Sequence, residues 1–204
     1  MTSPPTPAPT TDGRLARSAR TRAAVIDALL ALYEEGDLSP TAVRVAARAG
    51  VALRTVYGHF ADLESLYAEA GERELSRLVE RAVAIPAELP YDERVRRLAA
   101  GRADVLEWLL PVMRASGMRE PVSPQLQRNR ERFVALGDLE TRQVLAPELA
   151  RLARERQEQV VHAVHLVAGG PAWAGLRVDR GLEADEAAEL LHTVLRATLD
   201  RMLL

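Results

Sequence analysis

The 204-residue sequence contains no cysteine and no lysine, and only 4% of its residues are aromatic. Without cysteine the chain cannot form a disulfide, bind a metal through thiolates or use a thiol nucleophile. It has no apolar run long enough to cross a bilayer, and its start lacks the apolar core of a signal peptide. We therefore expect a soluble, cytoplasmic protein with no membrane partner.

All 27 basic residues are arginine and they are spread over the whole chain, which indicates codon bias more than selection for phosphate contacts. The net charge of −2 is not typical of a nucleic-acid binder. Its distribution is uneven, because residues 14–60 carry seven arginines against four acids (+3) and residues 61–204 carry twenty against twenty-four (−4). A basic head on an acidic body suits a DNA reader with a separate second domain.

Strand-like alternation is lacking as well, and apolar residues recur at helical spacing, so the sequence predicts an all-α fold. Residues 1–18 begin with a Pro- and Thr-rich stretch and are predicted to be a disordered tail. The alternatives for Arg14, Arg17, Arg20 and Arg22 are a solvated helix start or a basic arm on DNA. We place a first domain at 19–65 and a second at 66–204. Helices are expected at about 19–35, 62–85 and 92–114. Pro111 should kink the last of these or end it early, and interruptions are expected at Gly137 and Gly169.

The most informative stretch runs from Ser39 to Phe60 and reads SPTAVRVAARAGVALRTVYGHF. Ser39 followed by Pro40 is typical of a helix N-cap and first position. The spacing of Ala46, Gly50 and Val56 fits a helix-turn-helix, which needs a small residue at the crossing, glycine in the turn and a branched residue between the helices. The first helix is expected to bury Val43, Ala46 and Ala47. The second is expected to bury Val51, Val56, Tyr57 and Phe60.

Together with the closing residues TVYGHF, this spacing resembles the DNA-binding domain of TetR-family (tetracycline-repressor-like) transcriptional regulators. The resemblance implies an N-terminal three-helix helix-turn-helix domain followed by a helical ligand-binding and dimerisation domain. It also implies a homodimer on a palindromic operator in double-stranded DNA, with recognition helices about 34 Å apart. We predict a repressor released by a small-molecule effector, with no cofactor and no enzymatic activity. The alternative is a DNA-binding dimer without such a ligand.

Six residues of the motif are candidates for contacting DNA. Arg54 suits a bidentate contact to guanine, and Thr55 suits a base or a phosphate. The resemblance assigns phosphate contacts to the tyrosine and histidine near the end of the recognition helix. The six candidates are Thr41, Arg44, Arg54, Thr55, Tyr57 and His59. Two positions depart from the family pattern: Ala52 replaces a hydroxyl cap, and Leu63 replaces a lysine.

The remainder of the chain is generic in sequence. Bulky apolar residues could line a ligand pocket there, although most such residues in a helical domain are core. The pocket candidates are Trp108, Leu109, Met113, Phe133 and Leu136. The resemblance implies dimerisation through the last two helices, for which Leu191, Leu195 and Leu199 supply an apolar stripe.

His162 and His165 lie three residues apart on a predicted helix, where two imidazoles can share a metal. No glutamate of a zinc-protease motif stands between them, and a metal site needs further ligands. A polar helix face or a dimer contact explains the pair as well, so we assign no metal. A small all-α enzyme using these histidines remains the third hypothesis.

Overall fold

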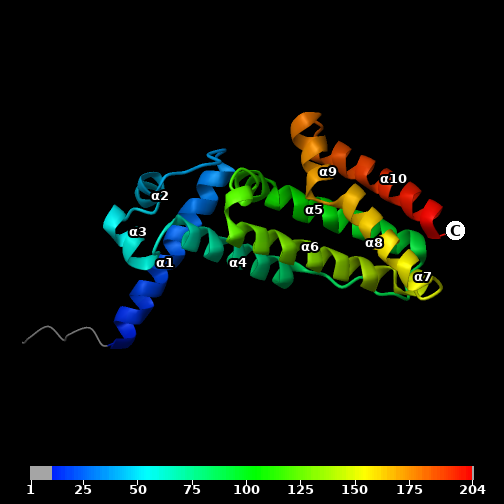
Figure 1. Cartoon of the computed structure of the whole chain (residues 1–204), viewed down its shortest axis with the longest axis horizontal. Helices are drawn as coiled ribbons and strands as arrows, with labels where there is room; N and C mark the ends of the chain where they lie inside the picture. The colour runs from blue at the N-terminus through cyan, green and yellow to red at the C-terminus, as the bar shows by residue number, and fades with distance from the viewer. Residues whose placement is uncertain (1–10, 204) are drawn as a thin grey trace, which may run out of the picture. The chain divides into compact units, whose positions relative to one another are not determined.

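The computed structural model describes residues 11–203, and all regular structure within them is helical, which confirms the all-α prediction (Figure 1). A 3₁₀ turn covers Glu120–Val122 and a π-helical turn covers Gly175–Asp179. The α-helices are α1 (Thr11–Glu34), α2 (Ala42–Arg48), α3 (Leu53–His59), α4 (Leu63–Arg81), α5 (Tyr91–Gly117), α6 (Pro124–Val144), α7 (Ala146–Leu149), α8 (Arg154–Ala168), α9 (Gly170–Ala174) and α10 (Ala184–Leu203).

The chain divides into two compact units, Met1–Ala70 and Gly71–Leu204, which we call the head and the body. The boundary falls inside α4, so this helix is shared by both. No helix in the described part of the chain is long and apolar enough to cross a membrane.

The head is a three-helix core closed by the first turns of α4. The apolar stripe of α1 packs against α2 and α3, as its helical spacing requires. Asp62 caps α4 as its position before the helix suggests, because its Oδ1 accepts a hydrogen bond from the Ser65 N–H at 2.8 Å. The fully buried side chains of the head include Val25, Leu29, Val45, Phe60 and Leu66.

The predicted start of the first helix at Ala19 is wrong, since α1 begins at Thr11. Of the predicted tail, residues 11–18 are helical and residues 1–10 lie outside the described residues. The Pro-rich composition stops at Pro9, and the arginines, alanines and leucine that follow are good helix formers. A helix already anchored by packing extends through such residues at little cost, because its nucleus exists.

The predicted cap and buried face of α2 are also wrong. Thr41, not Ser39, is the N-cap, and its Oγ1 accepts a hydrogen bond from the backbone N–H three residues on, at 3.3 Å. Val43 is 61% exposed and Ala47 is exposed too. Because this helix is rich in alanine, its sequence fits two possible buried faces that differ by a shift of one residue. Only packing against the rest of the head decides which face is buried. The buried residues of α2 are Ala42, Val45 and Ala46.

α4 ends at Arg81, four residues before the predicted Ile85. Residues 81–84 are all exposed, so no buried face stabilises further turns. Pro86 also disfavours a helical conformation in the residue before it.

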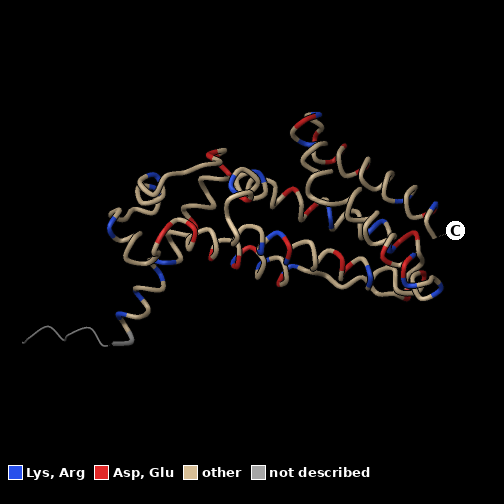
Figure 2. The backbone as a smooth tube through the Cα atoms, viewed as in Figure 1, with Lys and Arg blue, Asp and Glu red and all other residues tan. Residues whose placement is uncertain are grey.

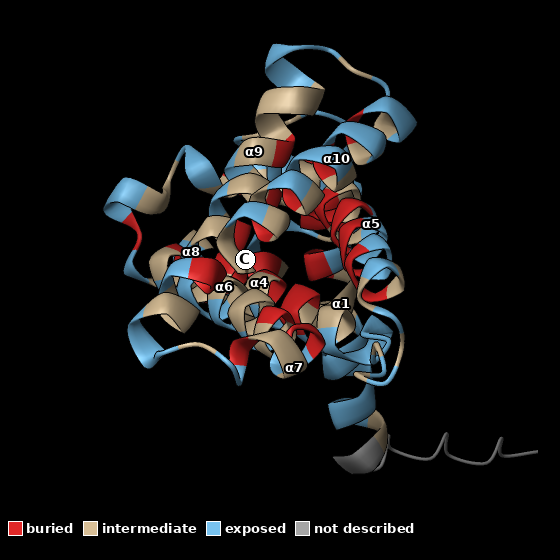
Figure 3. Ribbon diagram, turned by 90° about the vertical axis from the view of Figure 1, so that its right-hand side faces the viewer, coloured by how far each residue is buried: buried red, intermediate tan, exposed pale blue. Residues whose placement is uncertain are grey.

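The buried residues of the body core come mainly from α5, α8 and α10, with contributions from α6, α7 and α9 (Figure 3). Trp173 on α9 is almost fully buried in this core. Leu191, Leu195 and Leu199 are at most 1% exposed and belong to this core. α10 packs on α5 and α8 of its own chain. The prediction that these leucines offer apolar surface for dimerisation is therefore wrong, because the same stripe is used inside the chain.

The predicted interruption at Gly137 does not occur, since α6 continues through it, and Pro111 does not end α5, which continues to Gly117. An interior proline costs about 3 kcal/mol, which buried residues of α5 on both sides of Pro111 offset. Gly137 serves a close approach, since Arg102 Nη2 donates to its carbonyl at 2.5 Å and a Cβ there would lie 3.2 Å from Arg102 Nη1.

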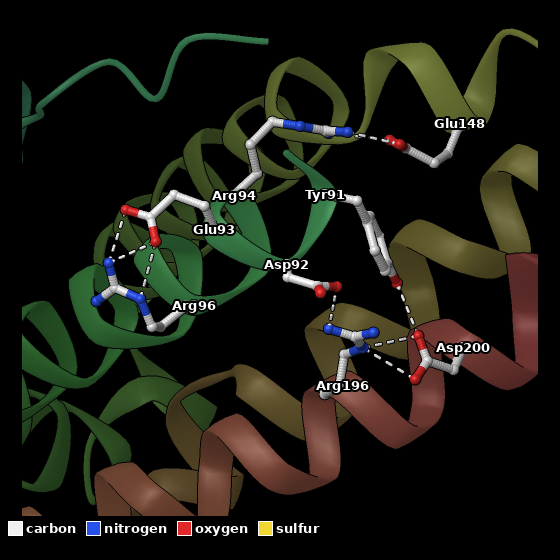
Figure 4. A network of polar contacts seen from close by, with 8 residues as sticks. All are labelled: Tyr91, Asp92, Glu93, Arg94, Arg96, Glu148, Arg196 and Asp200. Atoms are coloured by element: carbon white, nitrogen blue, oxygen red, sulfur yellow. Dashed lines mark hydrogen bonds and ion pairs between the residues drawn. The ribbon is translucent and has the colours of Figure 1, made fainter. Parts of the chain in front are cut away.

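Ion pairs join the ends of the body helices (Figure 4). Arg94 on α5 is 3% exposed and donates to the Glu148 carboxylate at 2.5 Å and to two backbone carbonyls. The Tyr91 hydroxyl donates to Asp200 at 3.2 Å, and Arg196 binds the same carboxylate at 2.8 Å. Burial, followed by the Asp200 charge, raises the pKa of Tyr91 to about 12.

Candidate nucleic-acid interface

The helix-turn-helix spacing read from the sequence forms in the structure. Residues 49–52 join α2 to α3, and within this turn Gly50 has φ +67°, a conformation open to glycine at no steric cost. Ala46 and Val56 are 4% and 1% exposed, so the small and the branched residue both lie in the head core. Ala52 is the N-cap of α3 and makes no side-chain cap bond, as its departure from the family pattern implies.

α3 presents an exposed face that carries no acidic residue. Leu53, Arg54 and Tyr57 are exposed, with the tyrosine at 51%, which excludes a core role for its ring. No carboxylate in the described part of the head pairs with Arg54. Thr55 and His59 are half-buried at the edges of this face. α2 also lacks acids, so the two helices together present only neutral and basic side chains.

Thr41 and Arg44, at the start of α2, have structural partners. Thr41 caps the helix. The Arg44 Nε lies 3.0 Å from the Asp37 carboxylate, yet its side chain is 62% exposed, so it remains accessible to a phosphate. DNA contact by all six candidates remains a prediction.

Arg22, one of the four arginines named for a basic arm, has structural partners that the sequence did not predict. Its Nη1 donates to the carbonyl of His59, at the end of α3, at 2.5 Å, and its Nε donates to the Glu69 carboxylate at 2.6 Å. Its guanidinium lies 4.6 Å from the centre of the Phe60 ring. The Glu69 hydrogen bond raises the pKa of Arg22. Arg22 thus ties α1 to the end of α3 and to α4, but in the sequence it is one of four similar arginines.

No protein-family profile and no curated protein matches the sequence. Among solved structures, a transcriptional regulator from Rhodococcus sp. RHA1 is 20% identical and superposes with a TM-score of 0.69, over 90% of this chain and 96% of its own. A TetR-like transcriptional regulator from Rhodococcus sp. RHA1 is 22% identical, with a TM-score of 0.55 over 90% of this chain and 96% of its own.

The chain has the fold of TetR-like transcriptional regulators. The resemblance read from residues 39–60 is therefore confirmed at the level of the fold, including an N-terminal helix-turn-helix and a helical body. In the TetR fold as this chain forms it, α3 is the second helix of the motif and α4 follows it directly into the body.

The five predicted pocket residues of the TetR-fold body do not gather at one described cavity. Leu109 is buried, and Met113 and Phe133 pack against the body core. The guanidinium carbon of Arg81 lies 5.1 Å from the centre of the Trp108 ring. Leu136 alone lines a groove of about 570 Å³ between α4 and α6. The groove residues are Leu75, Ser76, Val79, Glu80, Arg132, Ala135, Leu136 and Leu139.

His162 is exposed on α8 and His165 is half-buried. Within residues 11–203, no three His, Asp or Glu side chains are grouped as metal ligands. The metal hypothesis for this pair therefore gains no third ligand from the described part of the chain.

Proposed function

We propose that this chain is a DNA-binding transcriptional regulator that binds a palindromic operator as a homodimer and acts in the cytoplasm. The observation that carries the proposal is the exposed, acid-free face of α3 within a formed helix-turn-helix. Two solved proteins to which this chain is similar in fold are described as transcriptional regulators.

In this proposal α3 enters the major groove and α2 lies across the backbone. Arg54 donates two hydrogen bonds to guanine O6 and N7, and Thr55 contacts the neighbouring base or phosphate. Tyr57 and His59, towards the end of α3, bind phosphates. The Thr41 hydroxyl and the Arg44 guanidinium bind the backbone near the start of α2.

Selection of bound duplexes from a random pool tests this function with the full chain. We expect one enriched consensus with two inverted half-sites about one helical turn apart. A pool that shows no enrichment after repeated rounds would overturn the proposal.

The homodimer in this proposal forms through α8 and α10, which pack side by side. Three large apolar side chains on them remain exposed: Leu166 at 75%, Leu190 at 41% and Val194 at 39%. Apolar groups that a second copy can cover favour association.

Substituting Leu190→Asp and Val194→Asp together should give a monomer in sedimentation velocity, because two charges would be desolvated at the interface. Val122→Asp is the matched control, since Val122 is an exposed valine, at 84%, that lies outside α8 and α10. A dimer that survives the double substitution would rule out this surface.

We further propose that the regulator is a repressor and that the groove between α4 and α6 binds its small-molecule effector. Leu75, Leu136 and Leu139 offer apolar contacts there, while Arg132 and Glu80 offer charged groups that orient a ligand. Because α4 begins directly after the recognition helix, a ligand that shifts it changes the DNA-bound population.

Operator titrations across a panel of small molecules test the ligand. An effector should lower operator affinity by about 1–3 kcal/mol, and Leu136→Trp, which fills the groove, should abolish that effect while leaving affinity without effector unchanged. If an effector still acts on this variant, the groove is not its site. If no compound acts on the parent, the alternative of a ligand-free DNA-binding dimer is favoured.

A further inference from the structure

The first turns of α1 are exposed on every side. All residues from Arg14 to Arg20 are exposed, so no described part of the chain covers this segment. Figure 1 shows these turns extending past α2 and α3. They contribute nothing to the head core, although they are helical rather than the disordered tail that the sequence predicts.

Arg14, Arg17 and Arg20 follow one another at intervals of three, so their side chains fall within about a third of the helix circumference. No acidic residue lies between Gly13 and Arg22, and no carboxylate in the described part of the chain pairs with these three. Like charges at this spacing repel one another and destabilise the helix. A bound anion would relieve that repulsion.

The position of this strip is set by Arg22. The guanidinium of Arg22 contacts the carbonyl of His59, so α1 passes the end of the recognition helix at this point. At 1.5 Å per residue, Arg20 lies about 3 Å and Arg14 about 12 Å further along the axis. The arginine strip therefore starts beside the end of α3 and continues away from it (Figure 2).

We propose that these first turns of α1 are a helical arm that binds DNA phosphates beyond the bases read by α3. The inference rests on the proposed function and deepens it. Duplex DNA fits because it presents a dense row of phosphates next to the site of α3. An anionic membrane fits less well, since Leu15 is the only large apolar side chain on the arm.

The test measures operator affinity of the full chain from 50 to 400 mM salt. The variant replaces Arg14, Arg17 and Arg20 together with glutamine, which keeps helix propensity close to that of arginine. The control replaces three exposed body arginines by glutamine, for the same change in net charge. These are Arg114, Arg151 and Arg180, which lie outside α8 and α10.

Each phosphate contact contributes about 0.9 to the slope of log K against log salt, so three lost contacts lower it by about 2.7 for each arm that binds. We expect this decrease in the arm variant and not in the control, with the preferred consensus unchanged in both. Equal slopes in the two variants would overturn the arm and leave the regulator proposal intact.

A parent chain that binds no duplex DNA would overturn both proposals together. The same three proteins are also titrated with vesicles of phosphatidylserine and phosphatidylcholine. Arm-dependent vesicle binding, combined with an unchanged DNA slope, would assign the arm to membranes and overturn the inference.

Discussion

In the head, four of the seven arginines between residues 14 and 60 pair with no carboxylate among the described residues. In the body, several arginines join helices through buried or half-buried ion pairs. Arg94, Arg102 and Arg177 each bind a carboxylate on another helix and at least one backbone carbonyl. The side chain is the same in both units. The comparison teaches that its role depends on whether packing brings a carboxylate within reach.

The excess of basic residues in the head therefore does not measure its capacity to bind DNA. Arg44 and Arg48 are partly neutralised by Asp37 and Glu35. Arg22 is used structurally, as the body arginines are. The charge available to phosphates comes mainly from Arg54 on α3 and from the first turns of α1.

The largest expected difference between head and body arginines is the loss of stability when Arg94 of the body is replaced. Arg94→Ala leaves the Glu148 carboxylate and two carbonyls without their donor, which should lower the free energy of unfolding by about 3–5 kcal/mol. Arg96→Ala removes an exposed pair with Glu93 on the same helix and should lower the free energy of unfolding far less. Urea unfolding measures both, and equal losses would contradict a special role for the buried arginine.

Replacing Arg54 in the head should have the opposite effect, because it should weaken DNA binding and leave stability unchanged. Arg54→Ala should weaken binding to the selected operator by about 1–3 kcal/mol and relax one base position in each half-site. Unfolding should be unchanged, because the side chain makes no pair with a described carboxylate. Fluorescence anisotropy with the operator and its single-base variants measures this. Tight, unrelaxed binding by the variant would show that α3 does not read the groove through Arg54.

Arg22 sharpens the comparison because it lies in the head but is used as in the body. Arg22→Gln should cost about 1 kcal/mol of head stability, since the pair with Glu69 is half-exposed. It should also weaken binding to operator and random duplex alike, because the end of α3 loses its anchor. A change confined to one base position would instead indicate that Arg22 contacts DNA directly.

The smallest expected effect concerns the pH dependence of the body. Hydrogen bonds from Arg177 lower the pKa of Glu107 from its ordinary value of 4.5. Desolvation acts in the opposite direction, and the hydrogen bond from Trp173 lowers the pKa further. A lowered folded-state pKa stabilises the fold above pH 4.5, and this contribution is lost as the pH falls through the folded value. Glu107→Gln should flatten the stability curve below pH 4.5 in thermal unfolding. Parallel curves for parent and variant would exclude this carboxylate as a contributor.

The sequence by itself determined the features that depend on local chemistry. The spacing of Ala46, Gly50 and Val56 needs no information from distant residues, because a tight turn and a close helix crossing restrict residue types directly. The exposure of Arg54 on α3 followed from the same register, whereas that of Tyr57 did not. The lack of strand alternation likewise sufficed for the all-α class, because side-chain periodicity is a local property.

Only the tertiary structure decided the features that depend on what a residue meets. Leu191 and its neighbours on α10 are apolar whether a second chain or their own chain covers them, so periodicity could not assign their partner. The sequence at Gly137 predicts a helix interruption, and only the structure shows that this glycine leaves room for the Arg102 side chain. Arg22 and Arg20 differ by two positions in the sequence, and only folding places one beside Glu69 and leaves the other exposed, because an ion pair requires two groups to meet.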